Sequence, residues 1–142
     1  MNIIDLAPGD PRLTTDALPV LTELRPHLTP RLLEDVYATG HPQGLRFTAL
    51  YIAGRCVAVA GWRVIANTSA IRKLYVDDLV TAEAARSTGA GRELVAYLED
   101  RARELDCRVL DLDSGTQRTD AHRFYLRERF SIRAFHFSKL LR

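Results

Sequence analysis

The sequence contains little cysteine and no metal-binding cluster of side chains. Its two thiols, Cys56 and Cys107, fit neither a CxxC pair nor a zinc-site spacing. The histidines at 27, 41 and 136 also lack the spacing of metal ligands. We therefore expect no bound metal, two free thiols and a location in the reducing cytoplasm.

Long apolar runs and an excess of one charge sign are absent as well. No run approaches the ~20 apolar residues of a membrane helix. Residues 1–11 lack the apolar core, flanked by positive charge, of a signal peptide. Twenty basic and 18 acidic residues leave a net charge of only +2. We therefore expect neither a nucleic acid nor a membrane as a partner.

What remains is an ordinary globular composition. The chain has 142 residues, 46% of them hydrophobic and 27% charged, which predicts one domain over residues 1–142. A chain of this length buries enough surface to fold without disulfides or metals.

The hydrophobic spacing and the turn residues predict ten elements in the order β, α, α, β, β, β, α, β, α, β. They are expected at residues 2–6, 14–25, 30–39, 45–53, 55–65, 70–81, 89–106, 108–112, 119–128 and 132–141. A strand, a helix opened by glycine and a further strand predict one parallel β-α-β crossover in an otherwise antiparallel sheet. The fold class is therefore α/β, layered in the α+β manner.

The most informative segment is the loop at residues 86–91, RSTGAG, between a predicted strand and a predicted helix. The first N–H groups of a helix lack partners and carry a partial positive charge, so a phosphate can bind there. Glycines at positions 89 and 91 let the backbone come close to such a ligand. Arg86 can add a charged contact. The alternative is a plain turn, in which Gly89 provides only flexibility.

The run LYVDDLVT at residues 74–81, followed by Arg86-x-x-Gly89-x-Gly91, resembles the acetyl-CoA-binding region of the GNAT superfamily. This resemblance implies acetyl-CoA as co-substrate and a mixed, mostly antiparallel sheet with helices on both faces. It implies a pyrophosphate site in the backbone of six residues: Arg86, Ser87, Thr88, Gly89, Ala90 and Gly91. It also implies that Leu79, Val80 and Thr81 pair with the pantetheine arm like an extra strand.

A second segment, Ala121-His-Arg-Phe-Tyr125 with Phe130, resembles the family's AxxFYxxxGF motif. The resemblance implies that Tyr125 is the general acid that protonates the leaving thiolate of CoA. The alternative is an ordinary core aromatic residue. Two positions depart from the motif, because Arg118 replaces an asparagine and Arg129 replaces a glycine. His122 is expected to be a packing neighbour more than a base.

Asp77 and Asp78 are candidates for the general base, because an amine with a pKa near 10.4 must lose a proton before it attacks. Strand alternation predicts that the two carboxylates lie on opposite faces. The family resemblance favours Asp77 as the one nearer the substrate. A solvated edge or a bulge is the alternative. Asp113 and Ser114 are expected in a turn or a helix cap, with the cofactor cleft as their second interpretation.

The predicted function is transfer of an acetyl group from acetyl-CoA to a primary amine, by direct attack in a ternary complex. The acceptor is a small molecule, or alternatively a protein lysine or N-terminal amine; a non-catalytic acyl-CoA-binding module is the third interpretation. The resemblance places the N-terminal helices, with Arg25, His27, Glu34 and Tyr37, over the acceptor site. The last predicted strand, with Phe135, Phe137 and Leu140, forms either a sheet core or a homodimer interface.

Overall fold

A five-stranded sheet forms the centre of the computed structural model, which describes residues 1–142. Its strands are β1 (Asn2–Leu6), β2 (Arg46–Ile52), β3 (Arg55–Asn67), β4 (Ile71–Thr81) and β5 (Val109–Leu112), and they lie side by side in chain order. The pairs β1–β2, β2–β3 and β3–β4 are antiparallel, whereas β5 runs parallel to β4. The predicted mixed sheet with one parallel crossover is therefore confirmed.

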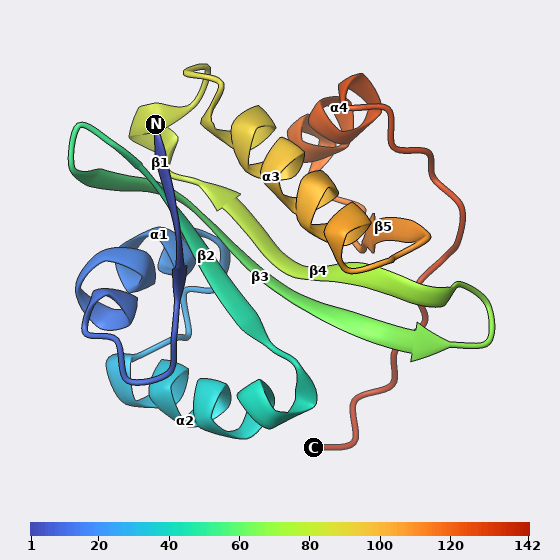
Figure 1. Ribbon diagram of the computed structural model, residues 1–142, viewed down its shortest axis with the longest axis horizontal. Coiled ribbons are helices and arrows are strands. Elements are labelled where there is room, and N and C mark those ends of the chain that lie inside the picture. The colour runs from blue at the N-terminus through green and yellow to red at the C-terminus, as the bar shows by residue number, and fades with distance from the viewer.

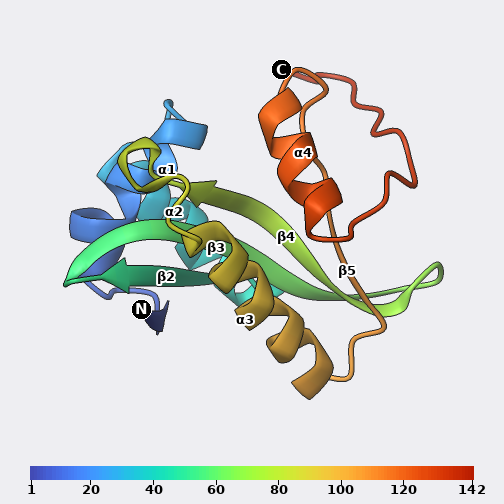
Figure 2. The ribbon, with the colours of Figure 1, turned by 90° about the horizontal axis from the view of Figure 1, so that it is seen from above.

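Helices cover both faces of this sheet, as the sequence predicts (Figures 1 and 2). On one face lie α1 (Leu18–Leu24) and α2 (Pro30–Gly40), and on the other lies α3 (Ala90–Glu104). The short α4 (Thr119–Arg127) follows β5. None of these helices combines the length and the apolar composition that a membrane crossing requires.

The first helix starts differently from its prediction. Leu13–Ala17 forms a single π-helical turn, closed by the N–H of Leu18 on the carbonyl of Leu13, and α1 begins only after it. Pro19 explains part of this irregularity, because it has no N–H to donate to the preceding turn. The predicted start of α2 at residue 30 is confirmed: Thr29 is the N-cap, and its side chain accepts a hydrogen bond from the N–H of Leu32.

Two apolar layers follow from the alternation of side chains along the strands. Val59 and Val80 point toward α1 and α2, where they pack with Leu21 and Leu33. The other strand face packs against the apolar stripe of α3, and Leu94 is among the fully buried residues there. These two layers hold β3 and β4 rigidly between them.

The predicted strand at residues 132–141 is wrong. No helix or strand follows α4, and residues 131–142 make no backbone hydrogen bond. A strand forms only where its backbone groups find a partner strand, and here the segment lies away from the edge of the sheet (Figure 2). Its predicted apolar contacts are absent too, because Phe135, Phe137 and Leu140 are exposed.

Thr48 is the one fully buried polar side chain in the core, and it links three strands. Its hydroxyl donates to Asp5 on β1 at 2.6 Å and accepts from the indole N–H of Trp62 on β3 at 2.9 Å. We predict that Thr48→Val lowers the free energy of unfolding by about 1–3 kcal/mol, because a buried donor loses its partner. Urea denaturation measures this, with the exposed turn variant Thr68→Val as the control. Equal stability of the two variants would contradict the prediction.

Candidate active site

A β-bulge in β4 creates the cleft of this protein. The register passes from Gly61 opposite Asp78 to Trp62 opposite Val76, so Asp77 is an extra residue without a partner on β3. Pairing between β4 and β5 begins at Lys73 with Val109 and stops at Val76 with Leu112. Beyond the bulge the two strands therefore separate, and an opening forms between them.

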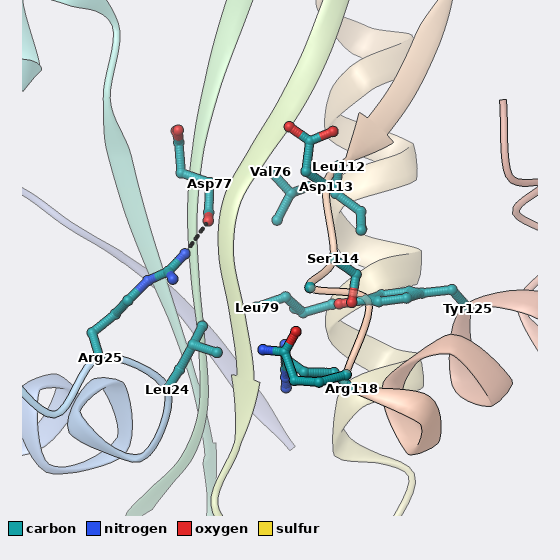
Figure 3. Close-up of a pocket in the computed structure, with 12 residues that line it drawn as sticks. Leu24, Arg25, Val76, Asp77, Leu79, Leu112, Asp113, Ser114, Arg118 and Tyr125 are labelled. Carbon is teal, nitrogen blue, oxygen red and sulfur yellow. Dashed lines mark hydrogen bonds between the residues drawn. The ribbon is translucent and has the colours of Figure 1, made fainter. Parts of the chain in front are cut away.

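A cavity of about 180 Å³ lies at this opening. Its walls come from the end of α1, the middle of β4, the end of β5, the following loop and α4 (Figure 3). The residues that line it are Leu24, Arg25, Val76, Asp77, Leu79, Leu112, Asp113, Ser114, Gly115, Gln117, Arg118 and Tyr125. The cavity thus brings together one predicted acid, Tyr125, and one predicted base, Asp77.

The two aspartates lie on the same face of β4, and the prediction of opposite faces is wrong. Asp77 accepts two hydrogen bonds from Arg63 of β3, at 2.8 and 2.7 Å. Asp78 stands opposite Gly61 and accepts from Arg25 Nε at 2.8 Å. The bulge is the reason, because its extra residue cancels one step of the alternation.

These ion pairs also fix the end of α1 against β4. Besides binding Asp78, the Arg25 guanidinium donates to the carbonyl oxygen of Asp77 at 3.2 Å (Figure 3). Gly61 makes room on β3, since a Cβ there would lie 3.1 Å from Asp78 Oδ2 and 2.9 Å from the Phe47 ring. Both carboxylates are thus held in place by arginines, and Asp77 is the one that lines the cavity.

Tyr125 extends from α4 toward β4 (Figure 3). Its ring makes edge-to-face contacts with Phe124 and Phe130, and its hydroxyl makes no hydrogen bond within the protein. Burial raises the pKa of Tyr125, and the charge of Arg118 partly opposes this shift. The phenol therefore stays protonated at neutral pH and has a free proton to donate.

The loop after β5 supplies the outer wall. Asp113 accepts a hydrogen bond from the hydroxyl of Tyr75 at 2.8 Å and contacts His136 Nδ1 at 3.1 Å. It does not cap α4, whose N-cap is Arg118 without a side-chain bond. Like Ser114, it lines the cavity. His122 contacts the carbonyl oxygen of Gly115 at 2.7 Å, which fits its expected structural role.

The loop before α3 presents a row of free backbone donors. Gly89 is the N-cap with φ 87° and ψ 2°, a left-handed conformation that favours glycine. The backbone N–H groups of five residues find no acceptor within the protein: 87, 88, 89, 91 and 92. That of Ala90 has only a long bond of 3.4 Å to Thr88 Oγ1. Arg86 also has no carboxylate partner.

Gly91 is required by close packing. A Cβ there would lie 3.1 Å from Thr81 Oγ1 and 3.4 Å from the ring of Phe124. The first turn of α3 therefore lies against both the end of β4 and α4. The donor loop therefore lies close to the end of β4 and to Phe124, the neighbour of Tyr125 in the sequence.

Some site residues carry no signal in the sequence. Arg63 and Tyr75 belong to the site only because β3 and β4 pair in a bulged register. Of the four residues singled out on the N-terminal helices, Arg25 alone lines the cavity. Tyr37 is buried in the core, where its hydroxyl donates to the carbonyl of Leu6 at 2.6 Å.

Comparisons with known proteins agree with this geometry. A model of the acetyltransferase (GNAT) family matches residues 11–130. Over 126 residues, which are 87% of this chain and 89% of the relative, the chain is 32% identical to an uncharacterized N-acetyltransferase of Bacillus subtilis (strain 168).

Solved structures show the same fold. One, a protein of Agrobacterium tumefaciens (strain C58) assigned to the acetyltransferases, has a TM-score of 0.82 and 25% identity over 99% of each chain. An aminoglycoside N-acetyltransferase in complex with CoA has a TM-score of 0.80 and 13% identity over 97% of this chain and 93% of its own.

The class of protein is therefore an N-acetyltransferase, as the sequence predicts. More specifically, the chain belongs to the acetyltransferase (GNAT) family, whose co-substrate is acetyl-CoA. No observation favours the alternative of a non-catalytic module.

Proposed function

We propose that residues 1–142 act as one catalytic domain that transfers the acetyl group of acetyl-CoA directly to a primary amine in a ternary complex. The observation that carries this proposal is that three features lie around the end of β4: the donor loop before α3, the free edge of β4, and α4 with the phenol of Tyr125. The free thiols of Cys56 and Cys107 are consistent with work in a reducing cytoplasm.

The free edge of β4 supports binding of the pantetheine arm. The N–H of Ala82 bonds to the carbonyl of Val57, so the pair of Val80 with Val59 also exchanges hydrogen bonds. Leu79 and Thr81 consequently direct their backbone groups away from β3, into the gap where β5 has ended. In this arrangement the amides of the arm pair with Leu79 and Thr81, while Val80 contributes only to the core.

The loop of residues 86–91 supports binding of the pyrophosphate. Its unpartnered N–H groups lie at the positive end of the 15-residue helix α3. In our proposal the phosphate oxygens accept from Ser87, Thr88, Gly89 and Gly91, and the Arg86 guanidinium adds a charge-assisted contact.

The two sides of the cavity support the chemistry. Nitrogen of the amine attacks the thioester carbonyl, the C–S bond breaks, and the leaving thiolate takes the proton of Tyr125. The phenolate recovers a proton, through water, from the acetylated nitrogen as the amide forms. The proton of the ammonium goes to Asp77, directly or through water, while Arg63 holds the carboxylate in position. Asp78 is then a positioning residue, because its carboxylate is bound to Arg25 and it does not line the cavity.

A small-molecule amine is the acceptor class that we favour. The cavity of about 180 Å³ is smaller than the ~300–1,000 Å³ of whole ligand pockets, so it suits the amine end of a small acceptor. Its walls come from α1, β4, the loop after β5 and α4, and they surround this end on several sides. A protein lysine or N-terminal amine is the alternative outcome of an acceptor screen.

We predict that Tyr125→Phe lowers kcat by about 10²–10⁴-fold, because the thiolate loses its proton donor. The KM for acetyl-CoA should change little, since the phenol makes no contact that positions the cofactor in advance. The measurement is release of the CoA thiol with a panel of small primary amines and lysine peptides. Tyr97→Phe, which removes a half-exposed hydroxyl on α3, is the control. Unchanged kcat in Tyr125→Phe would remove the proposed role of this residue.

For the pyrophosphate site we predict that Arg86→Ala weakens binding of acetyl-CoA about tenfold, through loss of one charged hydrogen bond. Isothermal titration calorimetry measures the dissociation constant. Arg103→Ala, at the other end of α3, is the matched control and should leave it unchanged. If both variants bind equally well, the phosphates do not contact Arg86.

A further inference from the structure

Arg118 is the one cationic side chain lining the cavity that has no acidic partner. The other cationic residue of the lining, Arg25, donates to Asp78 at 2.8 Å. Arg118 is the N-cap of α4 and is half-buried, and its guanidinium makes neither a hydrogen bond nor an ion pair within the protein. A guanidinium always carries its charge and offers a planar set of N–H donors that fits an oxyanion. Arg118 therefore offers a binding group for an anion at the cavity.

The free guanidinium lies near the reacting groups. Figure 3 shows Arg118 extending from the start of α4 toward β4, which is also the direction of Tyr125. Burial raises the pKa of Tyr125, and the positive charge of Arg118 opposes this rise, so the two groups lie within electrostatic reach of each other. An anion bound to Arg118 consequently lies in the same cavity as the phenol of Tyr125 and the carboxylate of Asp77.

Ser114 provides a second free donor in the lining of the cavity. Its Oγ is buried and has no hydrogen-bond partner within the protein. A buried hydroxyl without a partner costs free energy, which a ligand that accepts its hydrogen bond recovers. The loop from Ser114 to Arg118 turns back on itself, because the N–H of Arg118 donates to the carbonyl of Gly115 at 3.0 Å. The two unpartnered side chains are thus held at the two ends of one tight turn.

The charges on the other side of the cavity favour an acceptor with an anionic group of its own. Asp77 is already neutralised by Arg63, through hydrogen bonds of 2.8 and 2.7 Å. An ammonium group that enters therefore adds a positive charge beside the uncompensated charge of Arg118. A negative group on the same acceptor compensates both charges, whereas a second ammonium group would be repelled by Arg118.

We propose that the acceptor is a small zwitterionic amine, whose oxyanion binds Arg118 and Ser114 while its ammonium group binds Asp77. This assignment rests on the catalytic proposal above, which gives Asp77 its role. The cavity of about 180 Å³ receives both groups when only a few bonds separate them. A carboxylate and a phosphate both present the pair of oxygens that a guanidinium binds. Arg118 is then the residue that determines the specificity for the acceptor.

Release of the CoA thiol with matched pairs of amines tests the proposal. One pair is β-alanine and its neutral amide, β-alaninamide, and the other is O-phosphoethanolamine and ethanolamine. We expect kcat/KM to be about 10–100-fold higher for the anionic member of a pair, the gain from one hydrogen-bonded contact with a charged group. The pair with the larger ratio distinguishes a carboxylate from a phosphate as the preferred anion.

Variants of Arg118 test whether this residue causes the preference. Arg118→Gln should lower the ratio within each preferred pair about tenfold or more, and Arg118→Glu should shift the preference toward diaminopropane, which carries a second ammonium group. A general loss of activity lowers both members of a pair alike, so damage to the fold does not imitate a changed ratio. Arg123→Gln is the matched control on α4, because Arg123 is exposed and bound to Asp120 at 2.7 Å, and it should keep the ratio.

Equal kcat/KM within both pairs overturns the assignment of a zwitterionic acceptor and leaves the catalytic proposal intact, because amines are still acetylated. A preference that persists in Arg118→Gln overturns the role of Arg118. Release of no thiol with any amine contradicts the catalytic proposal, and a binding experiment then decides about the anion. In the presence of saturating CoA, the NMR signal of the Arg118 Nε–H group should shift on addition of β-alanine or O-phosphoethanolamine, and an unchanged signal with both overturns the assignment.

Discussion

β4 carries one residue more than β3 between Val76 and Asp78, and the geometry of the site follows from that β-bulge. The extra residue, Asp77, ends the pairing of β4 with β5. Two apolar layers pack against both faces of β3 and β4, so the sheet cannot close the gap by bending back. The opening between the strands is therefore a fixed feature of the folded chain, present before any ligand binds.

The same bulge sets the electrostatics of the cleft. It turns both aspartates to one face, where each meets an arginine from a different element: Arg63 from β3 and Arg25 from the end of α1. Within each ion pair the arginine and the aspartate neutralise each other, so that no charge is left unpaired in a half-buried place. The arginine on the opposite wall, Arg118, has no such carboxylate, and its charge acts on Tyr125 instead.

Much of this architecture could be predicted from the sequence, because the spacing of hydrophobic residues and the positions of turn residues depend on local structure. The loop of residues 86–91 and Tyr125 could be named because their motifs are contiguous. The common face of Asp77 and Asp78 could not be predicted, since a bulge depends on the register of β3 against β4. The place of Arg63 in the site could not be predicted for the same reason. Residues 132–141 have the composition of a strand, but composition does not show whether a partner edge is within reach.

The most direct test of this account is amide hydrogen exchange, followed by NMR with and without acetyl-CoA. We expect slower exchange at Leu79, Thr81 and the N–H groups of residues 87–92. Exchange at Val80 should not change, because its N–H already bonds to β3. Unchanged exchange along residues 79–92, or slowing only at the distant hollow around Tyr51 and Gly54, would contradict the central claim that the cleft opened by the bulge holds the cofactor.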